Sequence, residues 1–215
     1  SRAFQEMGHI YRAMGEYNRA LEAYHRATQL NSALTASLNA QIKILGQVGQ
    51  AQQIKPLKAQ LDYIQSLPKP LIAVIDLLAQ GKLVKAEQIC KLFLQKNPRN
   101  VEGMRLLSQI ALKLGVLDDA EFLLESALEF SPNNSRIRIE YIQVLRKRQN
   151  YAGALHQAKV LLEMDKENPQ FQSVFAIEAM QSGDFENALI VFDKILEKIP
   201  EDPVTLADIE VNETI

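Results

Sequence analysis

The sequence has 215 residues, of which 47% are hydrophobic, with a single cysteine and a formal net charge of −2. One cysteine excludes an intrachain disulfide framework and a cysteine-based zinc site, and apolar runs such as residues 71–79 are too short to span a bilayer. Residues 1–100 carry 13 Lys and Arg against 6 Asp and Glu, whereas residues 101–215 carry 11 against 20, so the two halves have charges of +7 and −9. This asymmetry is either the ordinary variation of helical surfaces or a sign that the two halves attract different partners.

A unit of 34 residues recurs along the chain, and residues 101–134 form its clearest copy. Two amphipathic helical segments flank a glycine in this unit, the second segment carries alanines at fixed positions, and a proline closes it. The recurring residues are Gly81, Gly115 and Gly183, then Ala86, Ala120, Ala154 and Ala188, and finally Pro98, Pro132 and Pro200. Self-similarity with this period predicts an all-α solenoid built from helix-turn-helix repeats.

The first unit, residues 1–34, carries two facing stripes of apolar and small residues. They are Phe4, Met7, Gly8 and Tyr11 on the first helix, and Ala20, Tyr24 and Ala27 on the second. This arrangement of large, small and aromatic residues resembles the tetratricopeptide repeat (TPR) family. The resemblance implies a right-handed α-α superhelix of six helix-turn-helix repeats, followed by a short C-terminal helix.

The second unit, residues 35–66, departs from the pattern. Pro56 lies within the first two turns of its second helix, where the loss of an amide donor predicts a shortened or kinked helix. Residues 67–70, which contain two prolines, follow directly. We therefore expect a bend of the superhelix at this place, with a simple local irregularity as the alternative.

Four further units are expected at residues 67–100, 101–134, 135–168 and 169–200. Residues 201–215 are interpreted as the start of a seventh repeat or as a polar capping tail. The chain opens at the first residue of a repeat, without a methionine, and closes within a repeat. We therefore expect a fragment of a longer cytoplasmic protein whose true N-terminus is missing.

The sequence contains none of the common motifs of catalysis or metal binding. His9, His25 and His156 are not clustered, and no HExxH, GxSxG or glycine-rich phosphate loop occurs. Cys90 stands at a packing position and is interpreted as a core residue, while the pair Asp118–Asp119 is interpreted as helix capping rather than catalysis. We therefore expect no catalytic residue, no metal and no cofactor in this segment.

The segment 136–148 places five basic residues and one acidic residue on a single predicted helix. Basic helices are often only solvated faces. Nucleic-acid binding is the alternative, but no interleaved aromatic platform supports it and the whole chain is mildly acidic. We therefore expect neither a nucleic-acid partner nor a membrane partner.

The resemblance to tetratricopeptide repeats also implies a binding groove, because in that family the first helices of the repeats line the concave surface. The positions correspond here to Arg2, Gln5, His9, Arg12, Asn39, Lys43, Leu71, Ile75, Arg105, Gln109, Lys113, Arg136, Gln143, Arg146 and Lys147. The set is polar and mostly basic, except for an apolar patch at Leu71 and Ile75. Such a groove suits an extended, acidic peptide or protein segment with an apolar anchor. The alternative is that these residues only confer solubility, and the oligomeric state stays open.

Residues 65–206 also resemble the N-terminal repeats of bacterial TPR-containing sulfotransferases, through runs such as QSLPKPL at 65–71 and GVLDDAEFLLESA at 115–127. In that family the repeats precede a separate domain that uses 3′-phosphoadenylyl sulfate, and no phosphate-binding loop of such a domain is present here. Two hypotheses follow. The segment is a non-catalytic scaffold that binds a protein or peptide, or it is the substrate-presenting arm of a sulfotransferase whose catalytic domain lies outside this chain.

Overall fold

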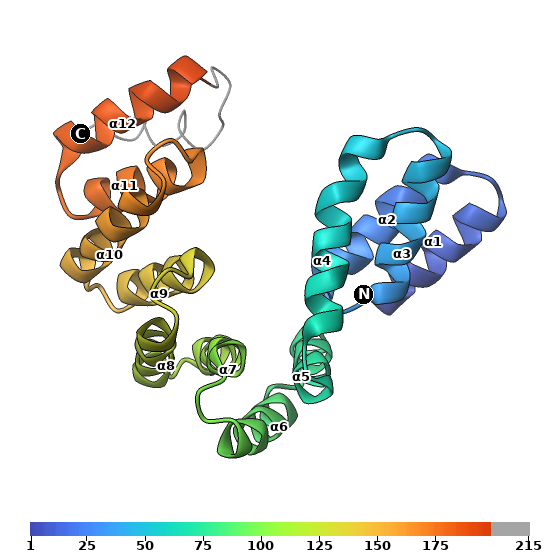
Figure 1. Ribbon diagram of the computed structural model, residues 1–215, viewed down its shortest axis with the longest axis horizontal. Coiled ribbons are helices and arrows are strands. Elements are labelled where there is room, and N and C mark those ends of the chain that lie inside the picture. The colour runs from blue at the N-terminus through green and yellow to red at the C-terminus, as the bar shows by residue number, and fades with distance from the viewer. Residues whose placement is uncertain (199–215) are drawn as a thin grey trace. The chain divides into compact units, whose positions relative to one another are not determined.

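The computed structural model describes residues 1–198, and within them every regular element is helical (Figure 1). The chain divides into two units, residues 1–98 and residues 99–215. The first unit contains α1 (Arg2–Ala13), α2 (Tyr17–Leu30), α3 (Thr35–Gln47), a 3₁₀ turn (Ala51–Gln53), α4 (Ile54–Ser66), α5 (Lys69–Ala79) and α6 (Leu83–Lys96). The second contains α7 (Val101–Leu114), α8 (Leu117–Phe130), α9 (Ser135–Lys147), α10 (Tyr151–Met164), α11 (Pro169–Gln181) and α12 (Phe185–Lys198). The expected seventh repeat or tail at 201–215 lies outside the described residues.

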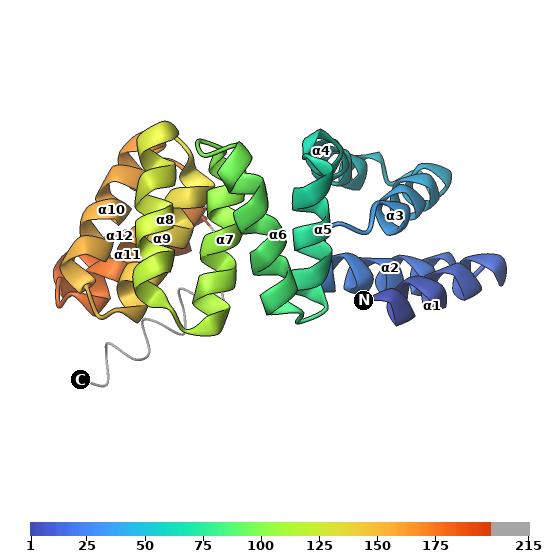
Figure 2. The ribbon, with the colours of Figure 1, turned by 90° about the horizontal axis from the view of Figure 1, so that it is seen from below.

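Consecutive helices pair into antiparallel hairpins, from α1 with α2 to α11 with α12 (Figure 2). Small side chains at the hairpin interfaces allow the two helices to approach closely. The alanines of the repeat pattern are fully buried, namely Ala20, Ala27, Ala86, Ala120, Ala127, Ala154, Ala158 and Ala188. The predicted all-α solenoid of helix-turn-helix repeats is therefore confirmed.

Most hairpins also pack on the next one, because the second helix of one hairpin lies against the first helix of the following hairpin. Ala20 and Tyr24 of α2 form one buried cluster with Ala40 and Ile44 of α3. In the second unit α8 packs on α9 in the same way, and α10 packs on α11. This repeated contact is the element that turns separate hairpins into a solenoid.

The second helix of the degenerate repeat, α4, has an irregular start. It starts late, at Ile54, after a 3₁₀ turn, so Pro56 is the third residue of α4. A first-turn amide has no acceptor within its own helix, so a proline costs little there. α4 has 13 residues, against 14 in α2, α6, α8 and α10, so the predicted shortening is slight and lies at the start of the helix, where the 3₁₀ turn precedes it.

The expected bend after this repeat is present within the first unit. α5 lies across the end of α4 instead of packing along it (Figures 1 and 2). Asn31, at the end of α2, donates through Nδ2 to Asp76 Oδ1 of α5 at 2.7 Å and accepts from the amide of Ala33 at 3.0 Å. Arg2 adds a long ion pair of 3.8 Å to the other oxygen of Asp76. The third hairpin therefore contacts the first, which a straight array of repeats would not allow.

The turns inside the hairpins need a left-handed backbone residue, and the fifth hairpin supplies it without a glycine. Gly115, between α7 and α8, has φ of 79°, and the matching residue between α9 and α10 is Gln149, with φ of 61°. A side chain in this region is strained, whereas glycine adopts it readily.

Replacing Gln149 by glycine should therefore stabilise the second unit by about 1 kcal/mol. The reverse change at the matching turn, Gly115→Gln, should destabilise it by a similar amount, although nothing lies within 4 Å of an added Cβ there. Urea unfolding followed by circular dichroism would measure both. Equal stabilities of Gln149→Gly and the parent would show that the turn is not strained.

Asparagines cap the first helices of the second unit, a feature that we did not predict from the sequence. Asn100 accepts a hydrogen bond from the amide of Gly103 at 2.8 Å, Asn134 from that of Ile137 at 3.2 Å, and Asn168 from that of Gln170 at 3.0 Å. Such side chains satisfy amides that have no partner in the first turn. The spacing of 34 residues between these asparagines was a signal that could have revealed them.

Candidate functional site

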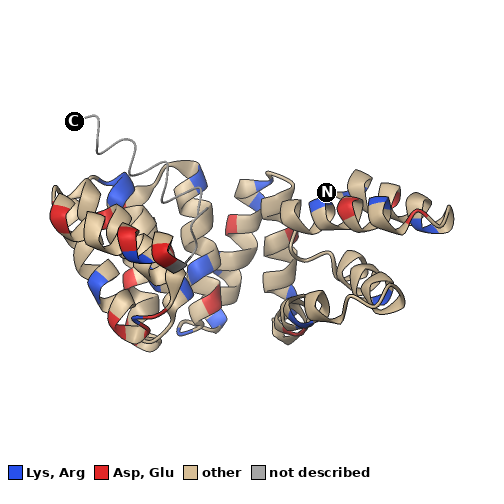
Figure 3. Ribbon diagram, turned by 90° about the horizontal axis from the view of Figure 1, so that it is seen from above, with Lys and Arg blue, Asp and Glu red and all other residues tan. Residues whose placement is uncertain are grey.

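Seven of the fifteen predicted groove residues lie on the first helices of the second unit. We call their side chains at the groove positions the first-helix face, which comprises Glu102, Arg105, Gln109 and Lys113 on α7, Arg136, Gln143, Arg146 and Lys147 on α9, and Gln170, Ser173 and Gln181 on α11. Contacts between side chains join α7 to α9 and α9 to α11. Lys and Arg are interspersed with Asp and Glu over the helices of the second unit (Figure 3). On the face itself Glu102 is outnumbered by Lys and Arg.

Arg105 occupies a groove position on α7, but its side chain is only 2% exposed. Its Nε and Nη2 donate to the two carboxylate oxygens of Glu102 at 2.9 and 2.5 Å, and its Nη1 donates to Glu140 Oε1 at 2.7 Å. Gln109 donates to the same oxygen of Glu140 at 3.1 Å. A buried arginine held by two carboxylates fixes α7 against α9. Arg105 therefore serves the packing of the helices and is not available to a ligand.

Arg146 connects the next two first helices, α9 and α11, in a similar way. Its guanidinium lies 3.3 Å from Glu178 of α11, whose side chain is almost completely buried. Burial raises the pKa of Glu178, and the neighbouring Arg146 offsets this only in part. The second carboxylate oxygen, Oε2, is buried and has no hydrogen-bond partner. The pair joins α9 to α11, but it does not fully replace the water that the carboxylate of Glu178 loses on burial.

The raised pKa of Glu178 predicts a pH-dependent stability. The folded protein binds this proton more tightly than the unfolded chain, so the contribution is favourable at low pH and is lost as the pH rises through the raised pKa. Glu178→Gln, which stays neutral at every pH, should therefore be more stable than the parent at neutral pH. The difference should shrink towards about pH 4, where both chains are neutral at this position. Urea midpoints at the two pH values would test this, and an equal or lower midpoint for the variant at neutral pH would contradict it.

Two further arginines of the basic segment 136–148 are also held by groups within the fold. Arg138 is buried and donates to the carbonyl of Pro132 at 2.6 Å and to Gln157; burial lowers its pKa. Arg148 contacts Glu121 at 2.8 Å and also pairs with Asp118. Arg138, Arg146 and Arg148 are thus engaged within the fold, whereas Arg136 and Lys147 of the same segment are exposed. The interpretation of this helix as a solvated basic surface was wrong for Arg138.

Asp118 and Asp119 do not cap α8 through their side chains, contrary to our expectation. The N-cap residue is Val116, which has no side-chain oxygen, and the two acids stand in the first turn. Asp118 instead pairs with Arg148. The carboxylates still favour the positive end of the helix dipole.

The candidate groove residues of the first unit are mostly exposed and separate. Arg2, Arg12, Asn39 and Lys43 are exposed, and Gln5 and His9 are half-buried. His9 Nδ1 lies 2.6 Å from the hydroxyl of the buried Tyr24, so the ring is held by the hairpin.

The expected apolar patch of the groove is absent. Leu71 and Ile75 are buried in the core of the first unit. α5 packs on α6, and its residue Asp76 also contacts the first hairpin. A ligand cannot use these two residues as an anchor.

Six residues of the first-helix face are exposed, and two of them, Gln170 and Gln181, are on α11. The other four are Lys113, Arg136, Gln143 and Lys147. Lys113 and Lys147 stand at the ends of α7 and α9, where they also favour the negative end of the helix dipole. These side chains form the part of the first-helix face that can meet a partner.

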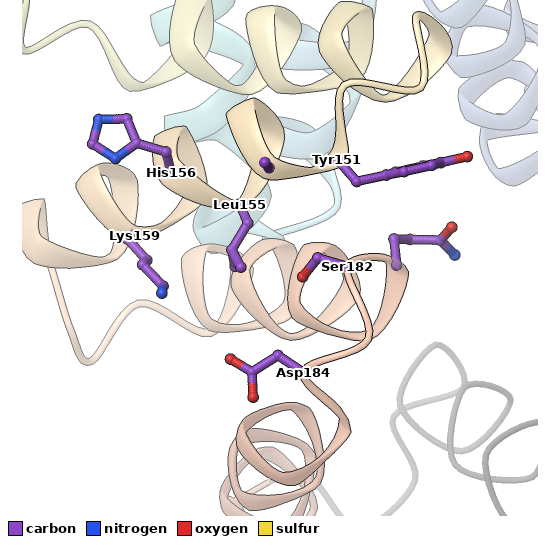
Figure 4. A pocket seen from close by; sticks show the side chains of 8 residues that line it. Tyr151, Leu155, His156, Lys159, Ser182 and Asp184 are labelled. Atoms are coloured by element: carbon purple, nitrogen blue, oxygen red, sulfur yellow. The ribbon is translucent and has the colours of Figure 1, made fainter.

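A separate hollow of about 450 Å³ lies between α10 and the turn before α12, and no pattern in the sequence indicated it. Leu155 points from α10 toward this turn, and Tyr151 extends the other way (Figure 4). Ser182 donates to the carbonyl of Ala179 at 2.9 Å, and Asp184 accepts from Asn187 at 2.9 Å. Both polar groups thus serve the ends of their own helices, and the hollow shows no arrangement for catalysis.

The described residues contain no cluster of ligating side chains that could hold a metal ion. Among residues 1–198, none of the helices combines the length and the apolar character that a membrane span requires. Cys90 is fully buried, which agrees with its interpretation as a core residue.

The buried alanines, the glycine turns and the stacked hairpins define a tetratricopeptide-repeat protein, a class whose arrays act as binding scaffolds. Residues 1–33 match the tetratricopeptide repeat itself. The fold is also that of YrrB, described as a TPR protein with an unusual peptide-binding site, with a TM-score of 0.54 at 16% identity over 96% of this chain and 90% of that chain. TTC0263, a thermophilic TPR protein of Thermus thermophilus, gives a TM-score of 0.53 at 18% identity over 100% of this chain and 99% of that chain.

Residues 91–205, more than half of the chain, match the family described as the cytochrome c-type biogenesis protein H TPR domain. The chain therefore belongs to this family. CcmH of Escherichia coli (strain K12), a cytochrome c-type biogenesis protein, is 25% identical over 170 residues, which are 76% of this chain and 48% of that protein. CcmH of Shigella flexneri matches to the same extent. The chain thus spans about half the length of the curated relatives it matches.

The family match covers most of the region that resembled the sulfotransferase-associated repeats. It does not support a relation to sulfotransferases, because it assigns the same residues to a family of non-catalytic cytochrome c biogenesis domains. The scaffold hypothesis is the one that the comparisons favour.

Proposed function

We propose that this chain is a protein-binding arm in cytochrome c-type biogenesis, and that its first-helix face holds an extended segment of a partner protein. The family match supports a role in cytochrome c-type biogenesis. The observation that carries the site is the row of three first helices joined by Arg105–Glu140 and Arg146–Glu178, which leaves Lys113, Arg136, Gln143 and Lys147 exposed.

The ion pairs beneath this face make it rigid before a partner arrives. Arg105 and Glu178 are nearly inaccessible, so their contacts hold the helix spacing without competition from water. A preorganised surface loses less conformational entropy on binding than a flexible one. The buried pairs and the exposed cations therefore have separate tasks, the first structural and the second in recognition.

The exposed residues suit an acidic, extended segment. Lys113 and Lys147 offer point charges at one end of the face, Arg136 offers a guanidinium near the other, and Gln143 offers amide donors and acceptors between them. Exposed charge pairs contribute little individually and are screened by salt. Because no apolar anchor is accessible at Leu71 and Ile75, we expect moderate affinity that falls with ionic strength.

A fluorescein-labelled, glutamate-rich peptide is a direct probe of this proposal. Lys113→Glu combined with Lys147→Glu should weaken its binding by about tenfold or more in fluorescence anisotropy at low salt, since charge reversal replaces attraction by repulsion. Arg146 should stay unchanged, because reversing it would place two carboxylates beside each other at Glu178.

The control variant carries the same change in net charge, but the two substitutions are on the second helices of their hairpins. Lys159→Glu combined with Lys194→Glu alters exposed residues of α10 and α12 and should change binding by less than about twofold. Equal weakening by both double variants would mean that the peptide senses only net charge, and the site would be rejected.

The role in cytochrome c-type biogenesis has its own test. In cells, the full-length protein with Lys113→Glu and Lys147→Glu should give a lower yield of c-type cytochromes, and the full-length protein with the control pair should not. A normal yield with the first pair would contradict the proposed role of this face. The expected cytoplasmic location stays a prediction.

A further inference from the structure

The hollow between α10 and the turn before α12 lies where a small residue replaces an arginine of the preceding repeat. Ser182 is the repeat equivalent of Arg148, 34 residues earlier. Arg148 reaches the second helix of the hairpin before it, where its Nε lies 2.8 Å from Glu121 Oε2 and its Nη1 pairs with Asp118. Ser182 instead donates its hydroxyl to the carbonyl of Ala179 at 2.9 Å. A hollow of about 450 Å³ therefore lies beside the serine, in the place that corresponds to the guanidinium.

The two residues that would pair with an arginine have changed as well. Ala152 and Leu155 of α10 stand at the positions that Asp118 and Glu121 hold on α8, and both line the hollow. Leu155 points toward the turn before α12 (Figure 4). The wall that α10 contributes is thus apolar where the preceding repeat has two carboxylates.

The charges around the hollow are compatible with an acidic guest. None of the residues that α10 contributes to the lining is acidic, whereas α8 carries Asp118, Glu121 and Glu125 at matching positions. Asp184 is the one carboxylate among the lining residues, and it accepts from Asn187 at 2.9 Å. An acidic segment can therefore approach α10 with little repulsion between like charges.

The hollow adjoins the face that we propose for partner binding. Gln181, the last residue of α11, belongs to the first-helix face and also lines the hollow. It is the repeat equivalent of Lys113 and Lys147, which stand at the ends of α7 and α9. A segment that follows these three helix ends arrives at the hollow. All residues of the first-helix face are polar, so an apolar contact has to come from beside it.

We propose that the hollow binds an apolar side chain of the partner segment and so supplies the anchor that the first-helix face lacks. This inference rests on the proposed function, because the guest belongs to the same acidic, extended segment. Its volume of about 450 Å³ lies within the range of about 300–1,000 Å³ that is typical of ligand pockets. Recognition of an extended peptide commonly combines contacts along the chain with a pocket for one of its side chains.

Peptides with a single leucine test the anchor. The probes are a fluorescein-labelled peptide of glutamate and serine, and equally charged peptides in which one serine at a time is replaced by leucine. Leucine at the position that reaches the hollow should tighten binding by about tenfold in fluorescence anisotropy, because its side chain leaves water. The contact is apolar, so Lys159, which also lines the hollow, remains a control for the charge of the first-helix face. A set in which leucine tightens binding at no position would overturn the proposal.

A variant that fills the hollow shows where the leucine binds. Ala152→Asp combined with Ser182→Arg copies the pair of Asp118 with Arg148 from the preceding repeat and leaves the net charge unchanged. Both altered residues are exposed, so the fold should persist. This variant should bind the leucine peptide within about twofold of the serine peptide, and the serine peptide as the parent does. A full leucine gain in this variant would overturn the proposal.

The matched control is Ala59→Asp combined with Ser66→Arg, which makes the same two changes at exposed residues of α4. It should keep the whole leucine gain, and loss of that gain would also overturn the proposal. Lys113→Glu combined with Lys147→Glu tests the proposed function separately, because it should weaken the binding of every peptide in the set. If this double variant changes nothing while filling the hollow abolishes the leucine gain, the hollow still binds the apolar side chain and only the role of the first-helix face fails.

Discussion

Replacing Arg105 by methionine should lower the free energy of unfolding by about 3 kcal/mol, the largest effect that we expect from a single substitution. Methionine fills much of the same space but removes the guanidinium that pairs with both Glu102 and Glu140, and Glu140 keeps a longer contact of 3.8 Å with Arg136. Removing one member of a buried ionic group is costly, because the remaining charges stay buried and uncompensated. Guanidinium chloride unfolding would measure the loss.

Two matched variants identify the cause of this loss. Arg26→Met makes the same chemical change at an exposed arginine, whose pair with Glu22 is 3.7 Å long, and should alter stability by less than about 0.5 kcal/mol. Adding Glu102→Gln and Glu140→Gln to Arg105→Met removes the stranded charges and should recover most of the stability. If Arg105→Met behaves like Arg26→Met, the buried pairs contribute nothing and the proposed rigidity of the first-helix face fails.

The hairpins could be predicted because their determinants are local and repeat. Ala120 and its equivalents are small because a neighbouring helix needs the space, and this requirement recurs every 34 residues. Turn glycines follow the same rule, with left-handed backbone at Gly115 and Gly183. Sequence alone thus reveals a contact when the same contact recurs in each unit.

The site was harder to predict because charge pairing is not periodic. The repeat positions of Arg105 and Arg146 indicated a groove lining, but their partners Glu140 and Glu178 lie outside the positions assigned to the groove. A pattern read one helix at a time cannot show that a carboxylate on the next helix lies within reach. Partner identity across helices depends on the spacing of the packed helices, which only the structure supplies.

The prediction of an accessible apolar patch at Leu71 and Ile75 failed for a different reason. Leu71 and Ile75 occupy groove positions only if the repeats stack regularly, and the bend between α4 and α5 breaks that regularity. The segment 67–70 signalled the bend, but the sequence did not show that Asn31 would bond to Asp76 and bring α5 against the first hairpin. Position within a repeat predicts exposure only where the neighbouring repeats are regular.

Gly8→Ala should destabilise the first hairpin, although alanine is the better helix former. A Cβ at this position would lie 2.6 Å from two ring atoms of Tyr24. Tyr24 is fully buried, between α1 and α3, so its ring has no room to withdraw. Overpacking of this kind costs about 1–3 kcal/mol, which outweighs a helix-propensity gain of up to about 1 kcal/mol. Thermal unfolding followed by circular dichroism would record a lower midpoint.

Gly46→Ala is the matched control, since it makes the same change in α3 of the same unit. The nearest atom to an added Cβ there is Ile54 Cδ1, at 4.0 Å, so only the propensity gain remains and stability should rise by about 0.5–1 kcal/mol. Gly8→Ala should also cost less when Tyr24 is replaced by leucine, because the two changes act on one contact and are not additive. An unchanged cost in the Tyr24→Leu background would show that the ring does not set the spacing of α1 and α2.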